Sequence, residues 1–395
     1  MTDASAGTAA EQPPLRVTTL EIFFDLVFAF TLTQLTSVLA TRLSWLSVFQ
    51  VLLVFGLLWW MYGAYAWLTN TRPPVHTAER LPLLAGMAGF LVVGLAIPRG
   101  FSSYGLVLGL GYLLVVLVHA VLYYRVNKNI LRVAPFNIAS ALLVVAAGFL
   151  HNRSGAADLA AYLLWVLALA VQLGSPLIVR PAGLFELRAS HFSERHSALL
   201  IVAIGESVAA VGIAAAGPAS QERSVHWQLL AVAVLGLAVA AALWWIVFGT
   251  GDEERSERML SEASSEQRTG LALQALFYGF IPLLLGLIGV AAGVFSAVAE
   301  AAGNPGTGVR SAHAAVLAAG AALFLAGDVI ARRMLSLGPV RWRITAAVLA
   351  LATTAVGAAA GLDPQLVLVG TVLALPLIAE REPAGRGAAG ADAAG

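Results

Sequence analysis

Long runs of apolar residues, separated by short polar or Gly- and Pro-containing segments, extend along most of the chain. Most runs approach the ~20 residues that a helix needs to cross a hydrocarbon layer, and lipid offers the backbone no hydrogen-bond partners outside regular structure. The pattern therefore predicts an all-α fold, a polytopic transmembrane helical bundle of about 12 spans. The predicted spans are residues 18–40, 45–69, 80–98, 103–126, 133–150, 158–178, 193–216, 227–249, 271–298, 311–335, 342–361 and 364–380.

The polar segments divide the predicted bundle. Residues 1–17 and 381–395 are predicted to be disordered cytosolic tails, and 251–270 a solvated cytosolic helix and loop. The first six-helix half then covers 18–180 and the second 181–380. Between the last two spans, Gly361, Asp363 and Pro364 either form a tight turn or kink one longer segment.

The two halves share features that raise the alternative of two parallel six-helix repeats. The first span of each half begins with a glutamate and carries a second acid further in, and the span after it contains a tryptophan pair. Units with an even number of helices repeat in parallel. The residues concerned are Glu21, Asp25, Trp59 and Trp60 in the first half and Glu194, Glu206, Trp244 and Trp245 in the second.

Composition supports a membrane protein and excludes several other classes. Hydrophobic residues make up 59% of the chain and charged residues 11%, whereas soluble domains have about 25% charged residues. The absence of cysteine excludes disulfides and thiolate metal sites. The arginines are spread over many loops, so we expect membrane lipids as partners and no nucleic acid. No motif implies a cofactor.

The basic residues give an orientation. If the N-terminus is cytosolic, only five of the 23 Lys and Arg residues lie outside. By the positive-inside rule, both termini are then predicted to be cytosolic. The five are Arg42, Arg99, Arg153, Arg223 and Arg310.

Acidic residues within the apolar runs are the strongest functional signal. Asp25 lies in LEIFFDLVFAF, one turn after Glu21, and Glu206 lies midway along HFSERHSALLIVAIGESVAAVG. A charged side chain at the centre of a spanning helix costs roughly 2.5–3.5 kcal/mol on insertion scales and usually faces a partner or a water-filled path. Interhelical hydrogen bonding is the structural alternative for both acids.

Several polar residues are predicted to share the depth of these acids. Counting along the helices places most of them in the cytosolic half and Glu206 nearer the midplane. If their helices turn these faces together, they form a polar chamber open to the cytosol, with Glu206 at its deeper end. The alternative is packing and interhelical hydrogen bonding. The candidate ion, proton or substrate pathway is Asp25, His119, Asn137, Gln172 and Glu206.

A second group is predicted to have a structural or gating role at the cytosolic mouth. Asp328 and Arg332 have the i,i+4 spacing that favours mutual neutralisation. A metal site is not expected, because HFSERH lacks the HExxH order and Arg195 would repel a cation. The group comprises Glu21, His191, Glu194, Arg195, Ser207, Asp328 and Arg332.

The acidic motifs resemble the bacterial low temperature requirement protein A family. The resemblance rests on LEIFFDLVFAF with Thr33, Gln34 and Leu35 after it, and on HFSERHSALLIVAIGES (191–207). It continues through ERLPLLAGMAGFLVVGLAIP (79–98), FYGFIPLLLG (277–286) and ALFLAG (322–327). The resemblance implies a multi-pass protein of the bacterial cytoplasmic membrane but gives no substrate.

Three functions are compatible with these residues. The first hypothesis is a secondary transporter of an unknown small molecule or ion, in which protonation of Asp25 or Glu206 biases the bundle between two packings. The alternatives are a cation channel, and a membrane-embedded lipid or envelope factor linked to growth in the cold. Since no nucleophile accompanies the carboxylates, an enzyme is not favoured.

Overall fold

Helices form the regular secondary structure throughout the part of the chain that the structure describes. This computed structural model describes residues 16–151, 155–179, 188–216, 227–249, 251–303 and 309–380. Eleven of its helices are long and apolar enough to cross a membrane, which confirms the all-α, multi-pass prediction. The predicted disordered tails lie outside the described residues, apart from residues 16 and 17.

The first half contains six long helices that correspond to the first six predicted spans. The shortest, α5, has 17 residues and falls below the length of the other spans. Two 3₁₀ turns, η1 (Ile97–Arg99) and η2 (Lys128–Arg132), connect neighbouring helices. The helices are α1 (Thr19–Thr41), α2 (Trp45–Thr71), α3 (Thr77–Ala96), α4 (Gly105–Val126), α5 (Ala134–Leu150) and α6 (Ala156–Val179).

The second half contains a π-helical segment and two short polar helices in addition to its spans. The polar segment predicted as a helix and loop forms α9 (Asp252–Glu262) and the start of α10 (Ser265–Ala272). A π-helical segment, η4 (Leu273–Tyr278), follows directly. The remaining helices are α7 (Ala189–Ala215), α8 (Trp227–Phe248), α11 (Phe280–Ala301), α12 (Arg310–Met334), α13 (Arg341–Ala360) and α14 (Leu362–Ala379).

The last two predicted spans are separate antiparallel helices. Gly361 has a φ of 107°, in the region that favours glycine, and ends α13 with a tight turn into α14. Arg343 at the start of α13 then meets Glu380, just beyond the end of α14, at 3.1 Å. The turn alternative is therefore the one the chain adopts.

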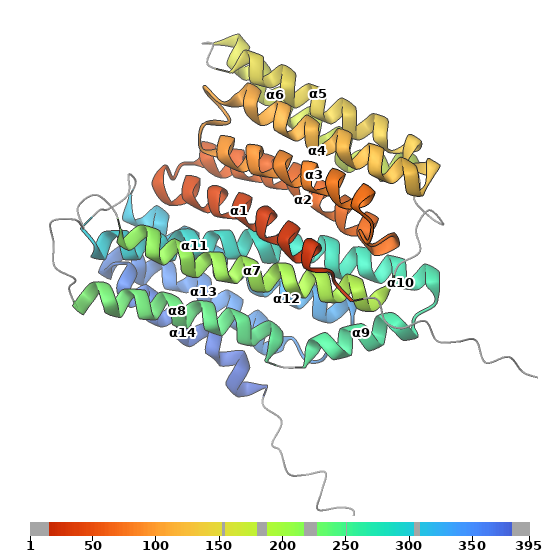
Figure 1. Ribbon diagram of the computed structural model, residues 1–395. Coiled ribbons are helices and arrows are strands. Elements are labelled where there is room, and N and C mark those ends of the chain that lie inside the picture. The colour runs from red at the N-terminus through yellow and green to blue at the C-terminus, as the bar shows by residue number, and fades with distance from the viewer. Residues whose placement is uncertain are drawn as a thin grey trace, which may run out of the picture.

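Helices α1, α7 and α11 lie where the two halves meet. Figure 1 shows α3–α6 grouped on one side and α8 and α12–α14 on the other, with α1 beside α7 and α11. Ion pairs join the starts of α1 and α7, and Arg343 joins the start of α13 to the ends of α12 and α14. We call the end of the bundle where α1, α7 and α13 begin the charged end. Whether the two halves are parallel repeats remains a prediction.

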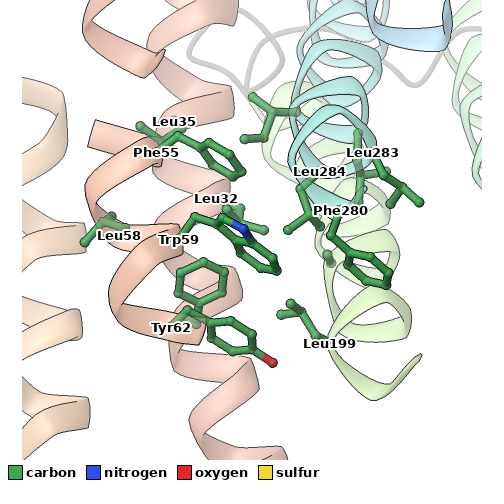
Figure 2. Close-up of a cluster of buried hydrophobic side chains, with 14 of the residues drawn as sticks. Leu32, Leu35, Phe55, Leu58, Trp59, Tyr62, Leu199, Phe280, Leu283 and Leu284 are labelled. Atoms are coloured by element: carbon green, nitrogen blue, oxygen red, sulfur yellow. The ribbon is translucent and has the colours of Figure 1, made fainter. Parts of the chain in front are cut away.

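An aromatic core fills the space between the halves. Trp59 of α2 stacks against Phe55, Phe277 and Phe280, with ring centroids 5.5 to 6.3 Å apart. Its indole nitrogen also donates to the backbone oxygen of Phe277, at 3.1 Å. Figure 2 shows this cluster extending from Leu32 and Leu35 of α1 across to Leu283 and Leu284 of α11. Large rings therefore occupy the centre of the interface.

Candidate functional site

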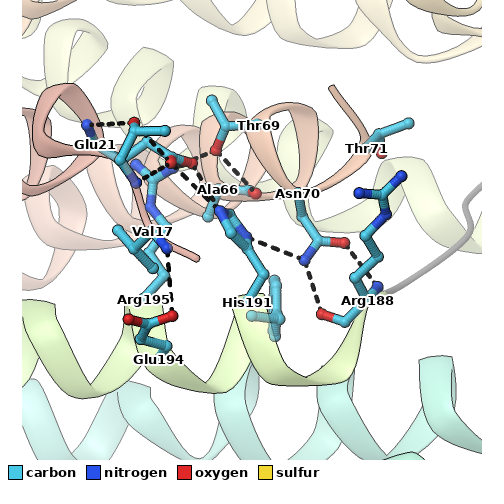
Figure 3. Close-up of polar contacts among 12 residues, drawn as sticks. Val17, Glu21, Ala66, Thr69, Asn70, Thr71, Arg188, His191, Glu194 and Arg195 are labelled. Atoms are coloured by element: carbon cyan, nitrogen blue, oxygen red, sulfur yellow. Dashed lines mark hydrogen bonds and ion pairs between the residues drawn. The ribbon is translucent and has the colours of Figure 1, made fainter. Parts of the chain in front are cut away.

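Arg195 of α7 lies at the centre of a buried polar network at the charged end. Its Nη1 is 3.1 Å from Glu21 Oε1, and its Nη2 is 3.3 Å from Asp25 Oδ1. The guanidinium also donates to the Thr69 hydroxyl of α2. The side chains of Arg195, Glu21 and Asp25 are fully buried. One cation therefore joins three helices, as Figure 3 shows for Glu21, Thr69 and Arg195. We call this set, with Tyr62 and His191, the Arg195 network.

Aromatic rings enclose the guanidinium and support Asp25. The centroids of Phe24 and Tyr62 lie 5.3 and 5.7 Å from Arg195 Cζ, within the range of cation–π attraction. The Tyr62 hydroxyl donates to Asp25 Oδ1 at 3.0 Å. Asp25 Oδ2 has no hydrogen-bond partner among the described residues. Asp25 is thus held through one oxygen while the other is sealed without a donor.

The charges of the Arg195 network do not balance by themselves. Two carboxylates, of Glu21 and Asp25, share one guanidinium, and His191 Nε2 lies 3.2 Å from Glu21 Oε1. With His191 neutral, one negative charge is in excess. One bound proton cancels it, and an uncompensated buried charge is costly. The network is therefore electrically neutral only with one proton bound.

The start of α7 is fixed by Asn70 of α2. The Asn70 amide donates to the Arg188 backbone oxygen and accepts from the Arg188 backbone nitrogen, both at 2.9 Å. Its Nδ2 also lies 3.3 Å from His191 Nδ1. Glu194 takes no part in the Arg195 network, because it is exposed and accepts from the Val17 backbone nitrogen at 3.2 Å. Asn70 thus contacts the Nδ1 side of His191, opposite the Nε2 that faces Glu21.

Glu206 occupies a different environment, deeper along α7. The Thr33 hydroxyl of α1 donates to Glu206 Oε2 at 2.7 Å, and no basic side chain among the described residues pairs with this carboxylate. Glu206 follows Arg195 by 11 residues, which is about 16 Å along a helix at ~1.5 Å per residue. It borders a cavity of about 10 Å³ whose other polar lining residues are Thr33, Thr36 and Ser207.

The three remaining pathway candidates lie among α2, α4, α5 and α6. Gln172 and the Tyr112 hydroxyl are hydrogen-bonded at 2.7 to 2.9 Å. Asn137 Oδ1 accepts from the Trp60 indole nitrogen at 3.1 Å. His119 bonds to the backbone oxygen of Ala64, and its Nε2 has no partner among the described residues. His119 and Asn137 border one cavity, of about 210 Å³, which Glu206 does not line.

The single polar chamber expected from the sequence is therefore divided into separate environments. Asp25 is sealed in the Arg195 network, Glu206 borders a small cavity between α1, α7 and α11, and His119 and Asn137 border a larger one. The aromatic core around Trp59 fills the space that the chamber would have needed.

Asp328 and Arg332 belong to a second network, confined to the second half. The i,i+4 pair expected of them is replaced: Arg343 pairs with Asp328 and, at 3.1 Å, with Glu380, whereas Arg332 pairs with Asp252 at the start of α9. The hairpin of α13 and α14 brings Arg343 and Glu380 to the end of α12, which a count along α12 alone does not predict. We call this set the Arg343 network.

Sequence reasoning missed several members of both networks. Tyr62 and Thr69 are buried in the second half of α2, as is Asn70 beside the network, and Arg343 is fully buried although it lies at the start of α13. One signal was present, because Tyr62 and Thr69 are seven residues apart and so share a helix face. Within the described ranges no group of three or more His, Cys, Asp or Glu side chains is arranged to hold a metal ion.

The helices and the buried ion pairs define a multi-pass membrane protein with charged networks inside its bundle. The chain matches the profile of the bacterial low temperature requirement A protein (LtrA) family over residues 16–379, and it belongs to that family. It is also similar to a Rhizobium meliloti (strain 1021) protein named "Uncharacterized protein RA0937". The two are 25% identical over 284 residues, which cover 69% of this chain and 67% of the relative.

Proposed function

We propose that this protein is a secondary transporter in which Glu206 is the coupling carboxylate for a proton or small cation. The observation that carries the proposal is a half-buried carboxylate midway along a spanning helix whose hydrogen-bond donor is a neutral hydroxyl, with no cation beside it in the described structure. An ionisable group kept within a membrane without a counter-charge is expensive, and such groups mark ion and proton pathways.

In this proposal, protonation of Glu206 changes the fit of two helices. Its carboxylate accepts from Thr33, so it joins α7 to α1 far from the charged end. Arg195 joins the same two helices near the charged end through Glu21 and Asp25. Neutralising Glu206 removes a charge from an apolar surround and weakens a charge-assisted hydrogen bond. The two helices can then repack about the fixed contact at Arg195, which biases the bundle toward a second state.

The size of the cavity beside Glu206 limits what binds there. Its volume of about 10 Å³ is near the roughly 10–15 Å³ that a single water needs. A proton, one water or one small cation fits, but an organic substrate does not. Glu206 is therefore proposed as the coupling site, and the cargo binds elsewhere.

The proposed orientation places the charged end in the cytosol, with both termini on that side of a bacterial cytoplasmic membrane. Arg188, Arg195, Arg332 and Arg343 all lie at the charged end. Arg42 and Arg99 lie at the opposite end, after α1 and α3. This asymmetry is the one that the positive-inside rule describes.

The experiment needs no knowledge of the cargo. Because the chain contains no cysteine, Thr41→Cys with Ala215→Cys places spin labels only at the far ends of α1 and α7. We expect the label distance in nanodiscs to change between alkaline and acidic buffer. In Glu206→Gln the distance should stay at the acidic value throughout, because the amide imitates the neutral acid. Glu194→Gln, an exposed acid on the same helix, is the matched control.

Two results would overturn the proposal. One is a pH response in Glu206→Gln equal to that of the parent. The other is ion flux in proteoliposomes that runs without coupling to any gradient of cargo, which would favour the cation channel. Lipid turnover by the purified protein, lost in Glu206→Gln, would instead favour the lipid-enzyme alternative.

A further inference from the structure

The cavity bordered by His119 and Asn137 has the properties of a ligand site. Its volume is about 210 Å³, larger than the roughly 150 Å³ of an engineered cavity that binds benzene. Rings supply much of its wall, including Trp60, Trp67, Tyr123 and Phe277. The π-helical segment η4 forms one side, and single π turns within helices are frequent at functional sites.

The wall excludes charged ligands. Among the described residues, no Asp, Glu, Lys or Arg lines the cavity, and the polar lining includes His119, Asn137, Ser175 and Thr269. An ion placed there would lose its hydration without gaining a counter-charge, which is costly. The occupant is therefore neutral and largely apolar.

Asn137 supplies a directed hydrogen-bond donor. Its Oδ1 accepts from the Trp60 indole nitrogen at 3.1 Å, and because an indole N–H only donates, the contacting atom must be oxygen. The orientation of the amide is thereby fixed. Its Nδ2 donates no hydrogen bond within the described residues. This nitrogen is nevertheless not one of the fully buried polar atoms that lack a partner. Since Asn137 is only 2% exposed, the space open to Nδ2 is the cavity that Asn137 lines.

We propose that this cavity binds a small neutral aromatic molecule through a hydrogen-bond acceptor, such as a carbonyl oxygen, that receives the Asn137 amide. The inference rests on the proposed function only in making this molecule the cargo. Binding itself is independent of coupling at Glu206, because Glu206 lines a different cavity.

Acetophenone and cumene make a matched pair of probes, because they have similar shape and only acetophenone carries a carbonyl. Equilibrium dialysis of tritiated acetophenone against protein in nanodiscs, with empty nanodiscs as the blank, measures binding above membrane partitioning. We expect saturable binding that cumene displaces about tenfold more weakly, which is what one buried hydrogen bond is worth.

Three variants locate the site. Ala64→Phe fills the cavity and should abolish binding of both probes, whereas Val121→Phe, on a position of α4 that is 53% exposed, should leave binding unchanged. Asn137→Leu should weaken acetophenone about tenfold and leave cumene unaffected. Retained cumene binding in Asn137→Leu shows that this variant is folded.

Each contrary outcome has a definite meaning. Absence of saturable binding, or binding that survives Ala64→Phe, overturns the site. Equal affinity for cumene and acetophenone in the parent overturns the acceptor recognition. Co-purified phospholipid that acetophenone cannot displace, seen by native mass spectrometry and lost in Ala64→Phe, means that an acyl chain fills the cavity and also overturns it. If Glu206→Gln and the parent both bind acetophenone but neither moves protons with it in vesicles, the site stands and the transporter proposal fails.

Discussion

The Arg195 network and the Glu206 site lie along the same pair of helices and treat acidic groups in opposite ways. In the Arg195 network, Glu21 and Asp25 share a fully buried guanidinium. About 16 Å further along α7, Glu206 has the Thr33 hydroxyl as its donor and, within the part of the chain that the structure describes, no paired cation. A paired acid can be retained for packing alone, but an unpaired one in lipid needs water, an ion or a proton. Charge compensation therefore distinguishes a structural ion pair from a responsive site, one that reacts to protonation or ion binding.

The Arg343 network supports the same distinction. Asp328 and Glu380 both pair with the fully buried Arg343, and Asp252 pairs with Arg332. Like the Arg195 network it joins helices at the charged end, but within the second half only. Among the described residues, the acids of both networks have arginine partners, and Glu206, further from the charged end, has none. The contrast thus follows depth in the bundle.

The largest expected effect comes from removing the shared cation. Arg195→Leu leaves the carboxylates of Glu21 and Asp25 buried without their shared cation. We expect a loss of about 3–5 kcal/mol in the free energy of unfolding, the usual cost of breaking a buried pair from one side. Titration with dodecyl sulfate in mixed micelles measures it.

A triple variant tests the cause of that loss. Combining Arg195→Leu with Glu21→Gln and Asp25→Asn removes all three charges, and we expect it to recover much of the stability, since neutral replacements of buried ion pairs are often tolerated. If the triple variant is less stable than Arg195→Leu alone, packing around Arg195 rather than charge compensation dominates.

A smaller effect is expected from Tyr62→Phe, which keeps the ring and removes the hydroxyl. Asp25 Oδ1 then keeps only Arg195, because the 3.0 Å bond from Tyr62 is lost. Leaving a buried acceptor short of a donor costs about 1–3 kcal/mol, and the same titration measures it. Tyr65→Phe is the control, since the Tyr65 hydroxyl bonds to the Val115 backbone oxygen instead. A stability within error of the parent would show that Asp25 is held as a neutral acid that does not need this donor.

The fold could be predicted from the sequence to a large extent, and the site only in part. Apolar runs and turn residues locate the helices because lipid imposes helical structure on each run separately. The free-energy cost of placing Asp25 and Glu206 in a membrane can likewise be predicted locally, since it follows from their place within apolar runs.

Partners could not be predicted, because they depend on which helices pack together. Asp25 and Arg195 are 170 residues apart in the chain, and no local spacing indicates that they meet. Asp328 and Arg332 have an ideal local spacing, yet Asp328 pairs with Arg343 because α13 packs against α12. The division of the expected chamber depends in the same way on Trp59 and the rings it stacks upon, which come from α2, η4 and α11.

Thr33→Val should have a modest effect that is confined to the Glu206 site. The change removes the 2.7 Å bond to Glu206 and keeps the shape of the side chain. We expect a loss of about 0.5–1.5 kcal/mol in alkaline buffer, where the bond is charge-assisted, and less in acidic buffer. Thr36→Val, at the same cavity but without this bond, should show no such dependence on pH. Equal losses in both buffers would mean that Glu206 does not change charge in this range.

Glu206→Gln should change stability least of all and function most. The amide still accepts from Thr33, fits the same space and removes an uncompensated charge, so we expect the free energy of unfolding to stay within about 0.5 kcal/mol of the parent. Removing one partner of a buried ion pair, as in Arg195→Leu, is instead expected to lower stability strongly. If Glu206→Gln instead costs several kcal/mol, the ionised carboxylate stabilises the fold, and Glu206 has a structural role like that of Asp25. Unchanged stability together with a lost pH response of the α1–α7 distance is the combination that only a responsive site gives.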